Sequence, residues 1–75
     1  MNIATYEKIV RENIISIRKE KGFSQENLAN ASQLDRTYIS MLERGIRNPT
    51  LKSLLKIAIA LEIKPVQLFE GVENE

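Results

Sequence analysis

Apolar side chains recur at spacings of three and four along most of the chain, the spacing that gives an α-helix one buried face. In the first part of the sequence the repeating apolar positions are Tyr6, Ile9, Val10, Ile14 and Ile17. Gly22 follows a last turn rich in lysine and arginine, and a glycine at this place ends a helix by adopting the left-handed conformation. This pattern predicts a first helix from about Thr5 to Lys21.

Two short helices are predicted next, each preceded by a residue type that caps helix amino termini. Ser24 precedes good helix formers over residues 25–31. Asp35 precedes a segment that runs from residue 36 to about residue 44 and stops at Gly45. Because helices of this length are marginal alone, we expect both to pack against neighbouring elements.

A fourth helix is expected after the turn that ends in Thr50, a further capping residue, and Pro65 favours the start of a one-turn fifth helix ending near Phe69. The predicted inner face of the fourth helix consists of Leu51, Leu54, Leu55, Ala58 and Leu61. The sequence thus predicts an all-α, five-helix architecture in which residues 1–75 form a single domain.

The residue types present exclude several kinds of site. The sequence has no cysteine and no histidine, so it offers no disulfide, no thiolate or imidazole metal ligand and no nucleophile with an imidazole base. Its carboxylates are scattered over predicted helix surfaces without an evident acid-base partner. We therefore expect no enzyme activity, no cofactor, no metal and no small-molecule ligand.

The hydropathy of the chain predicts no membrane partner. The longest continuous apolar run, Ile57 to Leu61, is far shorter than the roughly 20 residues that a membrane-spanning helix needs. The amino terminus mixes acidic and basic residues from Glu7 onward and lacks the apolar stretch of a secretory signal. A cytoplasmic location is the expectation.

Charge is distributed unevenly, although the net charge is only +1. Residues 1–35 sum to zero, whereas residues 36–56 carry Arg36, Arg44, Arg47, Lys52 and Lys56 against Glu43, a sum of +4. Residues 57–75 carry one lysine against four glutamates, a sum of −3. A basic segment of this kind attracts phosphates even when the whole molecule is nearly neutral.

The second and third predicted helices have the layout of a helix-turn-helix DNA reader, extending over about residues 24–44. The outward face of the third helix presents Arg36, Thr37, Ser40 and Arg44. Arg36 is the first candidate for base readout, since a guanidinium pairs with guanine O6 and N7 together. Thr37 offers a hydroxyl to phosphate or a methyl to thymine. Tyr38 either contacts DNA or packs against the start of the second helix.

The run from Phe23 to Leu61 resembles the XRE (Cro/CI-like) helix-turn-helix family, and a narrower stretch from Leu34 to Thr50 is similar to restriction-modification controller proteins. The matching positions are Phe23, Ser24, Gln25, Leu28, Ala29, Ile39, Ser40, Glu43, Gly45, Pro49, Thr50 and Leu61. The resemblance implies a lambda-repressor-like fold and a sequence-specific transcriptional regulator that binds double-stranded DNA.

Several residue roles accompany this resemblance. It implies that Gln25 contacts the DNA backbone or a nearby base, and that Arg18 and Glu43 pair across the first and third helices. Ser24 and Gln25 open the second helix, whose unpaired N–H groups suit a phosphate oxygen. Arg47, Asn48 and Lys52 cluster where such a layout faces the sugar-phosphate backbone.

Two positions depart from the family pattern. Gln33 stands where many relatives place glycine in the turn, and Glu62 replaces the glycine or asparagine common after the fourth helix. We expect Gln33 to adopt a positive φ angle, at a cost of about 1 kcal/mol.

Self-association is expected because one such domain reads only about four to six base pairs, too few to select one site in a genome. The candidate interface is the segment at about residues 59–72, with Ile59, Ile63, Val66, Leu68 and Phe69. The alternative is that these residues complete the monomer core. Two further hypotheses for the whole chain are an antitoxin-type DNA-binding partner of a toxin and a protein-interaction module with the same fold.

Overall fold

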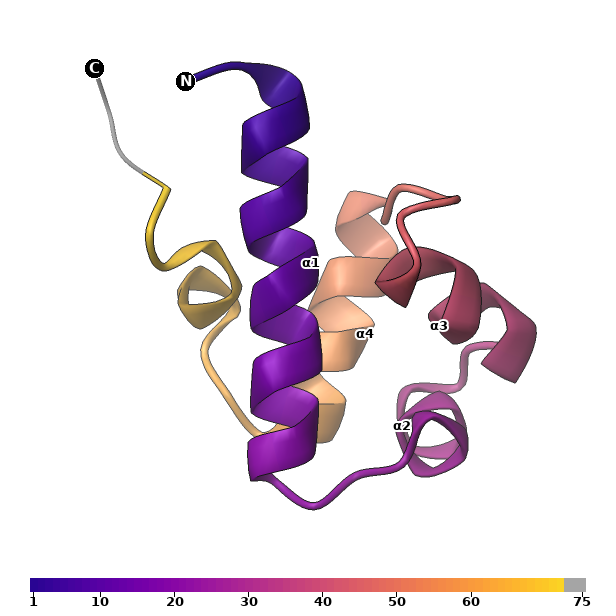
Figure 1. The fold of residues 1–75 in the computed structure, drawn as a ribbon. Helices are drawn as coiled ribbons and strands as arrows, with labels where there is room; N and C mark the ends of the chain where they lie inside the picture. The colour runs from indigo at the N-terminus through magenta and orange to yellow at the C-terminus, as the bar shows by residue number, and fades with distance from the viewer. Residues whose placement is uncertain (73–75) are drawn as a thin grey trace.

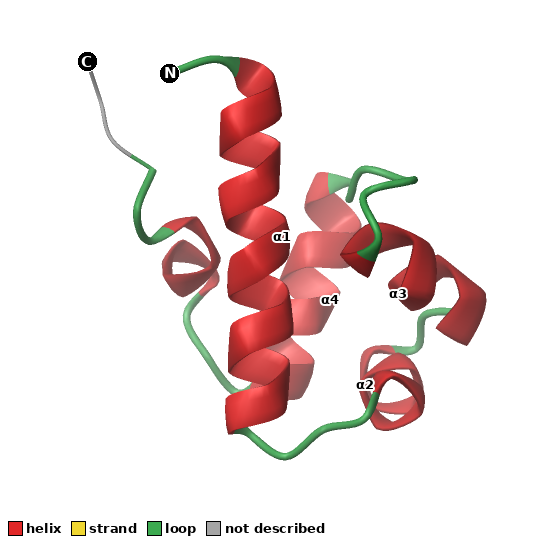
Figure 2. Cartoon of the chain, in the orientation of Figure 1, coloured by secondary structure: helices red, strands yellow, loops and turns green. Residues whose placement is uncertain are grey.

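The fold is known from a computed structural model that describes residues 1–72. It contains four α-helices, α1 (Ile3–Glu20), α2 (Gln25–Ser32), α3 (Arg36–Glu43) and α4 (Leu51–Leu61), followed by the 3-10 helix η1 (Pro65–Phe69). All regular structure in this part of the chain is helical, as Figures 1 and 2 show. The all-helical prediction is confirmed. The fifth predicted element, however, is a 3-10 helix.

Side-chain caps start the three shorter α-helices at the predicted positions. The Ser24 hydroxyl accepts a hydrogen bond from the Asn27 N–H at 2.9 Å, and an Asp35 carboxylate oxygen accepts one from the Thr37 N–H at 2.7 Å. Thr50 forms a reciprocal capping box with Ser53. Each bond satisfies an N–H that has no partner within its helix, which is why these residues determine where the helices begin.

The turn between α2 and α3 places Gln33 at φ 58°, so the predicted positive φ angle is confirmed. Glu62, which ends α4, has φ 56°. Both residues adopt the left-handed conformation that closes a helix carboxyl terminus. For side chains other than glycine this costs roughly 1–2 kcal/mol each.

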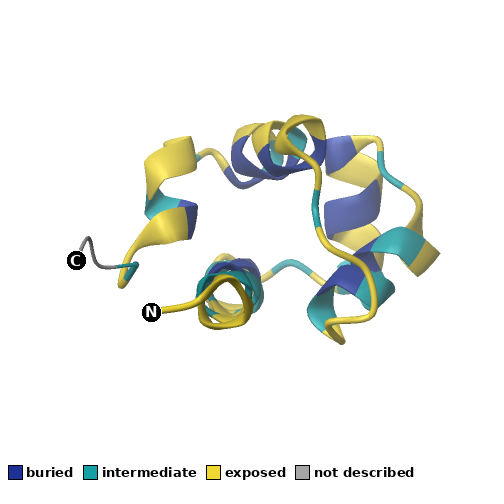
Figure 3. Cartoon of the chain, turned by 90° about the horizontal axis from the view of Figure 1, so that it is seen from above, coloured by how far each residue is buried: buried dark blue, intermediate teal, exposed yellow. Residues whose placement is uncertain are grey.

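The hydrophobic core lies between α1, α4 and η1 (Figure 3). The short helix α2 packs on α4, and α3 packs on α1 and α2. Fully buried side chains come from every helix. They are Ile14, Leu28, Ile39, Ile57, Leu61 and Leu68. The short helices α2 and α3 are therefore held by packing against the longer ones, as their length requires.

The predicted inner face of α4 is wrong at two positions. Leu51 is 73% exposed and Leu55 is 41% exposed, whereas Ser53 and Ile57 are buried. The reason is that α4 carries leucine or isoleucine on more than one face, so its periodicity alone does not select the face that packs. Ser53 is buried because its hydroxyl serves the capping box and accepts a hydrogen bond from the Tyr38 hydroxyl at 2.9 Å.

Leu68 was predicted at a dimer interface, and the structure corrects this. Its side chain is 0% exposed and belongs to the monomer core. Asn13 of α1 holds this segment in place, since its side-chain amide donates to the Leu68 carbonyl at 2.9 Å and to the Glu70 carbonyl at 2.8 Å. Ile63 is half-buried and also packs against the core.

Among the helices of residues 1–72, none has the length and apolar character needed to cross a membrane. Glu73 and Glu75, two of the four glutamates behind the predicted −3 of the carboxyl-terminal part, lie outside the described residues.

Candidate nucleic-acid interface

A polar recess of about 290 Å³ opens between the start of α2 and the outer face of α3. We call it the α2–α3 recess, and it is lined by Gln25, Arg36, Thr37, Ser40 and Arg44. All five residues were predicted DNA contacts, and the structure brings Gln25 of α2 together with the four that were predicted on the outward face of the third helix. The lining consists of guanidinium, hydroxyl and amide groups, the groups that bind base edges and phosphates.

The basic segment, residues 36–56, contains one acidic residue, and the side chain of that residue is buried and paired. Glu43 is the only acidic residue between residues 36 and 56, and its side chain is 6% exposed. Arg36 and Arg44 of the same helix remain exposed. The basic segment thus exposes the positive charge of its arginines while its own carboxylate is buried.

Beneath the recess lies a buried hydrogen-bond network that joins α1, α2 and α3. Arg18 donates from Nε to Glu43 Oε2 at 2.6 Å and from Nη2 to Glu43 Oε1 at 2.9 Å. Its Nη1 donates to the Phe23 carbonyl at 2.8 Å. The pair implied by the resemblance is therefore present, in the bidentate geometry that suits arginine and carboxylate.

Gln25 extends this network into the recess. Its Nε2 donates to Glu43 Oε1 at 3.0 Å, so the first residue of α2 is tied to the last residue of α3. The sequence did not predict this contact, because the two residues are 18 positions apart and only the packing of α2 on α3 brings them together. The contact sets the orientation of the Gln25 amide.

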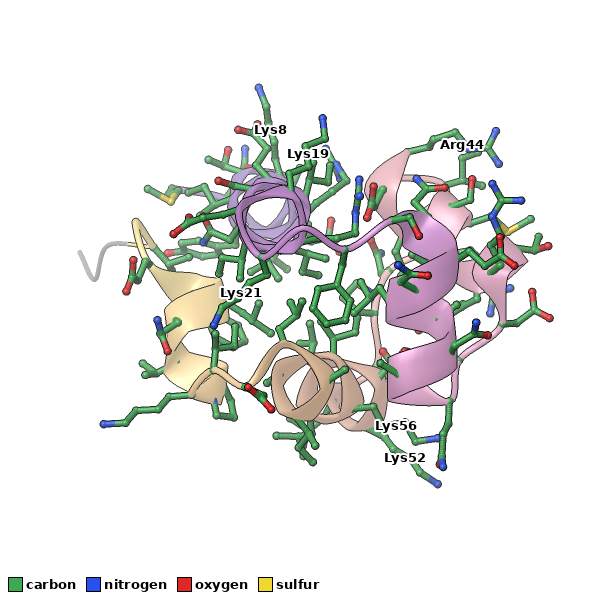
Figure 4. All side chains as sticks on the ribbon, turned by 90° about the horizontal axis from the view of Figure 1, so that it is seen from below. Lys8, Lys19, Lys21, Arg44, Lys52 and Lys56 are labelled. Carbon is green, nitrogen blue, oxygen red and sulfur yellow. The ribbon has the colours of Figure 1, made fainter. Side chains whose placement is uncertain are left out.

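A second recess of about 300 Å³, the α3–α4 recess, lies between α3 and the start of α4. Its lining includes the predicted phosphate contacts Arg47, Asn48 and Lys52 together with Tyr38 and Lys56. Lys56 was not among the predicted contacts. Figure 4 shows Lys52 and Lys56 projecting from the same side of α4, while Lys8 and Lys19 project from α1 elsewhere on the molecule.

Tyr38 occupies the floor of the α3–α4 recess. Its hydroxyl donates to Ser53 Oγ at 2.9 Å, and the Arg47 guanidinium lies 5.5 Å from the centre of its ring. The Tyr38 hydroxyl is thus bonded to the start of α4, whereas the two predicted alternatives were a DNA contact and packing against the start of the second helix. Stacking on Tyr38 also holds the Arg47 guanidinium at the recess.

Five large apolar side chains of α4 and η1 are exposed, and we call this set the apolar stripe. The stripe consists of Leu51, Leu55, Ile59, Val66 and Phe69, each of which is at least 41% exposed. Three of these residues, Ile59, Val66 and Phe69, were predicted at a dimer interface. Leu51 and Leu55 join them because they are absent from the core. Because α4 and η1 contact each other, exposed apolar side chains on both elements mark a candidate protein contact.

Two short helices in helix-turn-helix order, with a polar recess where the second meets the first, define the class of protein. The chain belongs to the helix-turn-helix family, whose model (HTH_3: Helix-turn-helix) matches residues 14–68.

Within that family the relatives of this chain include controller proteins. Control protein C.SmaI of Serratia marcescens is 43% identical over 70 residues, covering 91% of this chain and 83% of that protein. The crystal structure of the restriction-modification controller protein C.AhdI from Aeromonas hydrophila shares 46% identity, with a TM-score of 0.78 and coverage of 81% and 92%. The predicted resemblance to the XRE family and to controller proteins is confirmed.

A second similar structure contains DNA. It is a mutant of C.Esp1396I bound to its highest affinity operator site OM, with 49% identity, a TM-score of 0.79 and coverage of 87% of this chain and 86% of that one.

Proposed function

We propose that this protein is a sequence-specific transcriptional regulator that binds a palindromic operator as a homodimer, with α3 in the major groove. The α2–α3 recess carries the proposal, since it gathers five groups suited to base edges and phosphates, two of them guanidinium groups. The likeness to a C.Esp1396I mutant bound to its operator supports operator binding by this chain. Similarity to controller proteins favours an operator in a restriction-modification gene cluster.

Arg36 is the residue that we assign to base readout. It is exposed at the first position of α3, where side chains reach base edges when this helix lies in the major groove. Its planar fork matches guanine O6 and N7. Thr37, Ser40 and Arg44 share the recess and extend the contact along the groove.

The α3–α4 recess supplies backbone contacts in this proposal. Arg47, Asn48, Lys52 and Lys56 line it beside α3, where the sugar-phosphate chain flanks the groove. Ser24 adds the amino terminus of α2, whose partial positive charge suits a phosphate oxygen. Such contacts fix the register of the protein on the duplex and carry little sequence information.

The apolar stripe of α4 and η1 is the proposed contact between two copies. The stripe combines part of the predicted segment at residues 59–72 with neighbouring residues of α4. A dimer joined through it would read twice as many base pairs as a single domain. In a symmetric dimer the two copies of α3 lie about 34 Å apart, one turn of the double helix.

A band-shift experiment tests the function. Duplex DNA from upstream of the protein's own gene is titrated with the native chain, with Arg36→Ala and with the control Lys8→Ala, which removes an equal charge from α1. We expect the native chain and Lys8→Ala to bind alike, and Arg36→Ala to retain only weak, salt-sensitive binding. Equal binding by all three proteins would contradict the proposal.

A further inference from the structure

The network beneath the α2–α3 recess dictates which end of the Gln25 amide points outward. Glu43 Oε1 accepts from both Arg18 Nη2 and Gln25 Nε2, and Glu43 Oε2 accepts from Arg18 Nε. A carboxylate held by a guanidinium in this way only accepts hydrogen bonds. The NH₂ end of Gln25 must therefore face Glu43, and its Oε1 is directed away from that carboxylate.

This orientation gives the recess an acceptor that its two charged groups, Arg36 and Arg44, lack. Arg36 and Arg44 have donors only, and the hydroxyls of Thr37 and Ser40 either donate or accept. The Gln25 oxygen can only accept. A phosphate carries only acceptor oxygens and so offers this oxygen no hydrogen bond. In the major groove the donors are the exocyclic amino groups, adenine N6 and cytosine N4.

From this complementarity we infer that Gln25 reads an exocyclic amino group in each half-site and that Glu43 is the positioning residue that holds the Gln25 amide for this contact. The inference rests on the proposed function and makes it more specific. The two base contacts of the recess then differ in chemistry. Arg36 donates hydrogen bonds to acceptor atoms such as those of guanine, and Gln25 accepts one from an amino group. The buried ion pair also has a part in recognition beyond bracing the fold.

Deleting single amino groups from the operator tests the inference. In the duplex bound most tightly by the native chain, each adenine is replaced in turn by purine and each cytosine by 2-pyrimidinone, which removes the N6 or N4 amino group together with its Watson–Crick hydrogen bond. The native chain should lose about 2- to 10-fold in affinity at one position in each half-site, the range expected for one hydrogen bond. Whether that position holds adenine or cytosine identifies the base.

Gln25→Met is the decisive variant, because methionine has a similar length and no hydrogen-bonding amide. The affinity of Gln25→Met for the unmodified duplex should fall to about the affinity of the native chain for the duplex that lacks the amino group. Removing the amino group should then weaken the binding of Gln25→Met no further. Glu43→Gln should lose the same discrimination, since a neutral amide accepts or donates and no longer fixes Gln25. Both are measured at 10 °C after circular dichroism has established native helix content.

The outcomes separate the inference from the function on which it rests. If Gln25→Met remains as sensitive to amino-group removal as the native chain, the inference is overturned while the proposed function stands. The same holds if Gln25→Met weakens binding to the operator and to a scrambled duplex by equal factors, which is the behaviour of a phosphate contact. A native chain that binds both duplexes equally overturns the proposed function as well.

Discussion

Two buried charges, Arg18 and Glu43, illustrate how single side chains shape this molecule. Their side chains are 10% and 6% exposed, and each provides the other with hydrogen bonds that water would otherwise supply. Taking two charges out of water is costly, so such a pair adds little net stability over apolar residues of similar size. Removing one partner is different, because the other charge is then left buried alone.

Glu43→Gln should therefore lower the free energy of unfolding by about 3 kcal/mol, which in a domain of this size lowers the melting temperature by more than 10 °C. The control is the double variant Arg18→Met/Glu43→Leu, which replaces both charges and should recover most of the loss. Thermal unfolding followed by circular dichroism measures both. An unchanged melting temperature in Glu43→Gln would contradict the structural role of the pair.

The sequence reveals the identity of most candidate contacts but not their mutual bonds. The polar positions Arg36, Thr37, Ser40 and Arg44 are recognisable because they repeat on one face of a predicted helix. The hydrogen bonds from Gln25 to Glu43 and from Tyr38 to Ser53 join residues 18 and 15 positions apart. No local pattern predicts which residues so far apart in the sequence bond to each other, since these pairings depend on how α2, α3 and α4 pack.

At the scale of elements, the amino-terminal caps were the most reliable signals in the sequence. Ser24, Asp35 and Thr50 each form the predicted cap, because this bond depends only on the next two or three residues. The buried face of α4 was harder to predict. With leucine and isoleucine around most of its circumference, α4 has several apolar faces, and only its neighbours decide that Ile57 is buried and Leu51 is not.

The cap of α3 has a measurable energy. Asp35→Ala removes the 2.7 Å bond to the Thr37 N–H and should lower the free energy of unfolding by about 1 kcal/mol. Asp35→Asn keeps an oxygen at the same place and should cost only a few tenths of that amount, since asparagine caps as well as aspartate. Urea unfolding of the two variants distinguishes the cap from the charge. Equal losses would show that the charge of Asp35, and not its cap, is what stabilises α3.

The whole molecule presents two surfaces of different chemistry. The two recesses form a basic polar face, and the apolar stripe of α4 and η1 forms a hydrophobic one. A core built from so few large side chains stabilises a small domain only modestly. Burying the stripe against a second copy would add both stability and binding specificity.

Ile59→Glu tests the dimer. Ile59 is 76% exposed in the monomer, so a glutamate there leaves the fold intact but places a charge within the proposed interface. Ile46→Glu is the matched control, since Ile46 is 59% exposed and lies in the loop after α3. By sedimentation equilibrium at micromolar concentration, the native chain and Ile46→Glu should be dimers and Ile59→Glu a monomer. A native chain that sediments at 8.6 kDa under these conditions would exclude the proposed interface.

Whether the α2–α3 recess reads bases is best decided by measuring discrimination itself. Fluorescence anisotropy gives the dissociation constants of the native chain and of Arg36→Ala for an operator duplex and for a scrambled duplex of equal composition. The native chain should bind the operator at least about 10³-fold more tightly. In Arg36→Ala the ratio of operator affinity to scrambled-duplex affinity should fall by about 5- to 150-fold per half-site, with little change in affinity for the scrambled duplex. Equal weakening on both duplexes would mean that Arg36 contacts only phosphate, and would contradict the assignment of base readout to this recess.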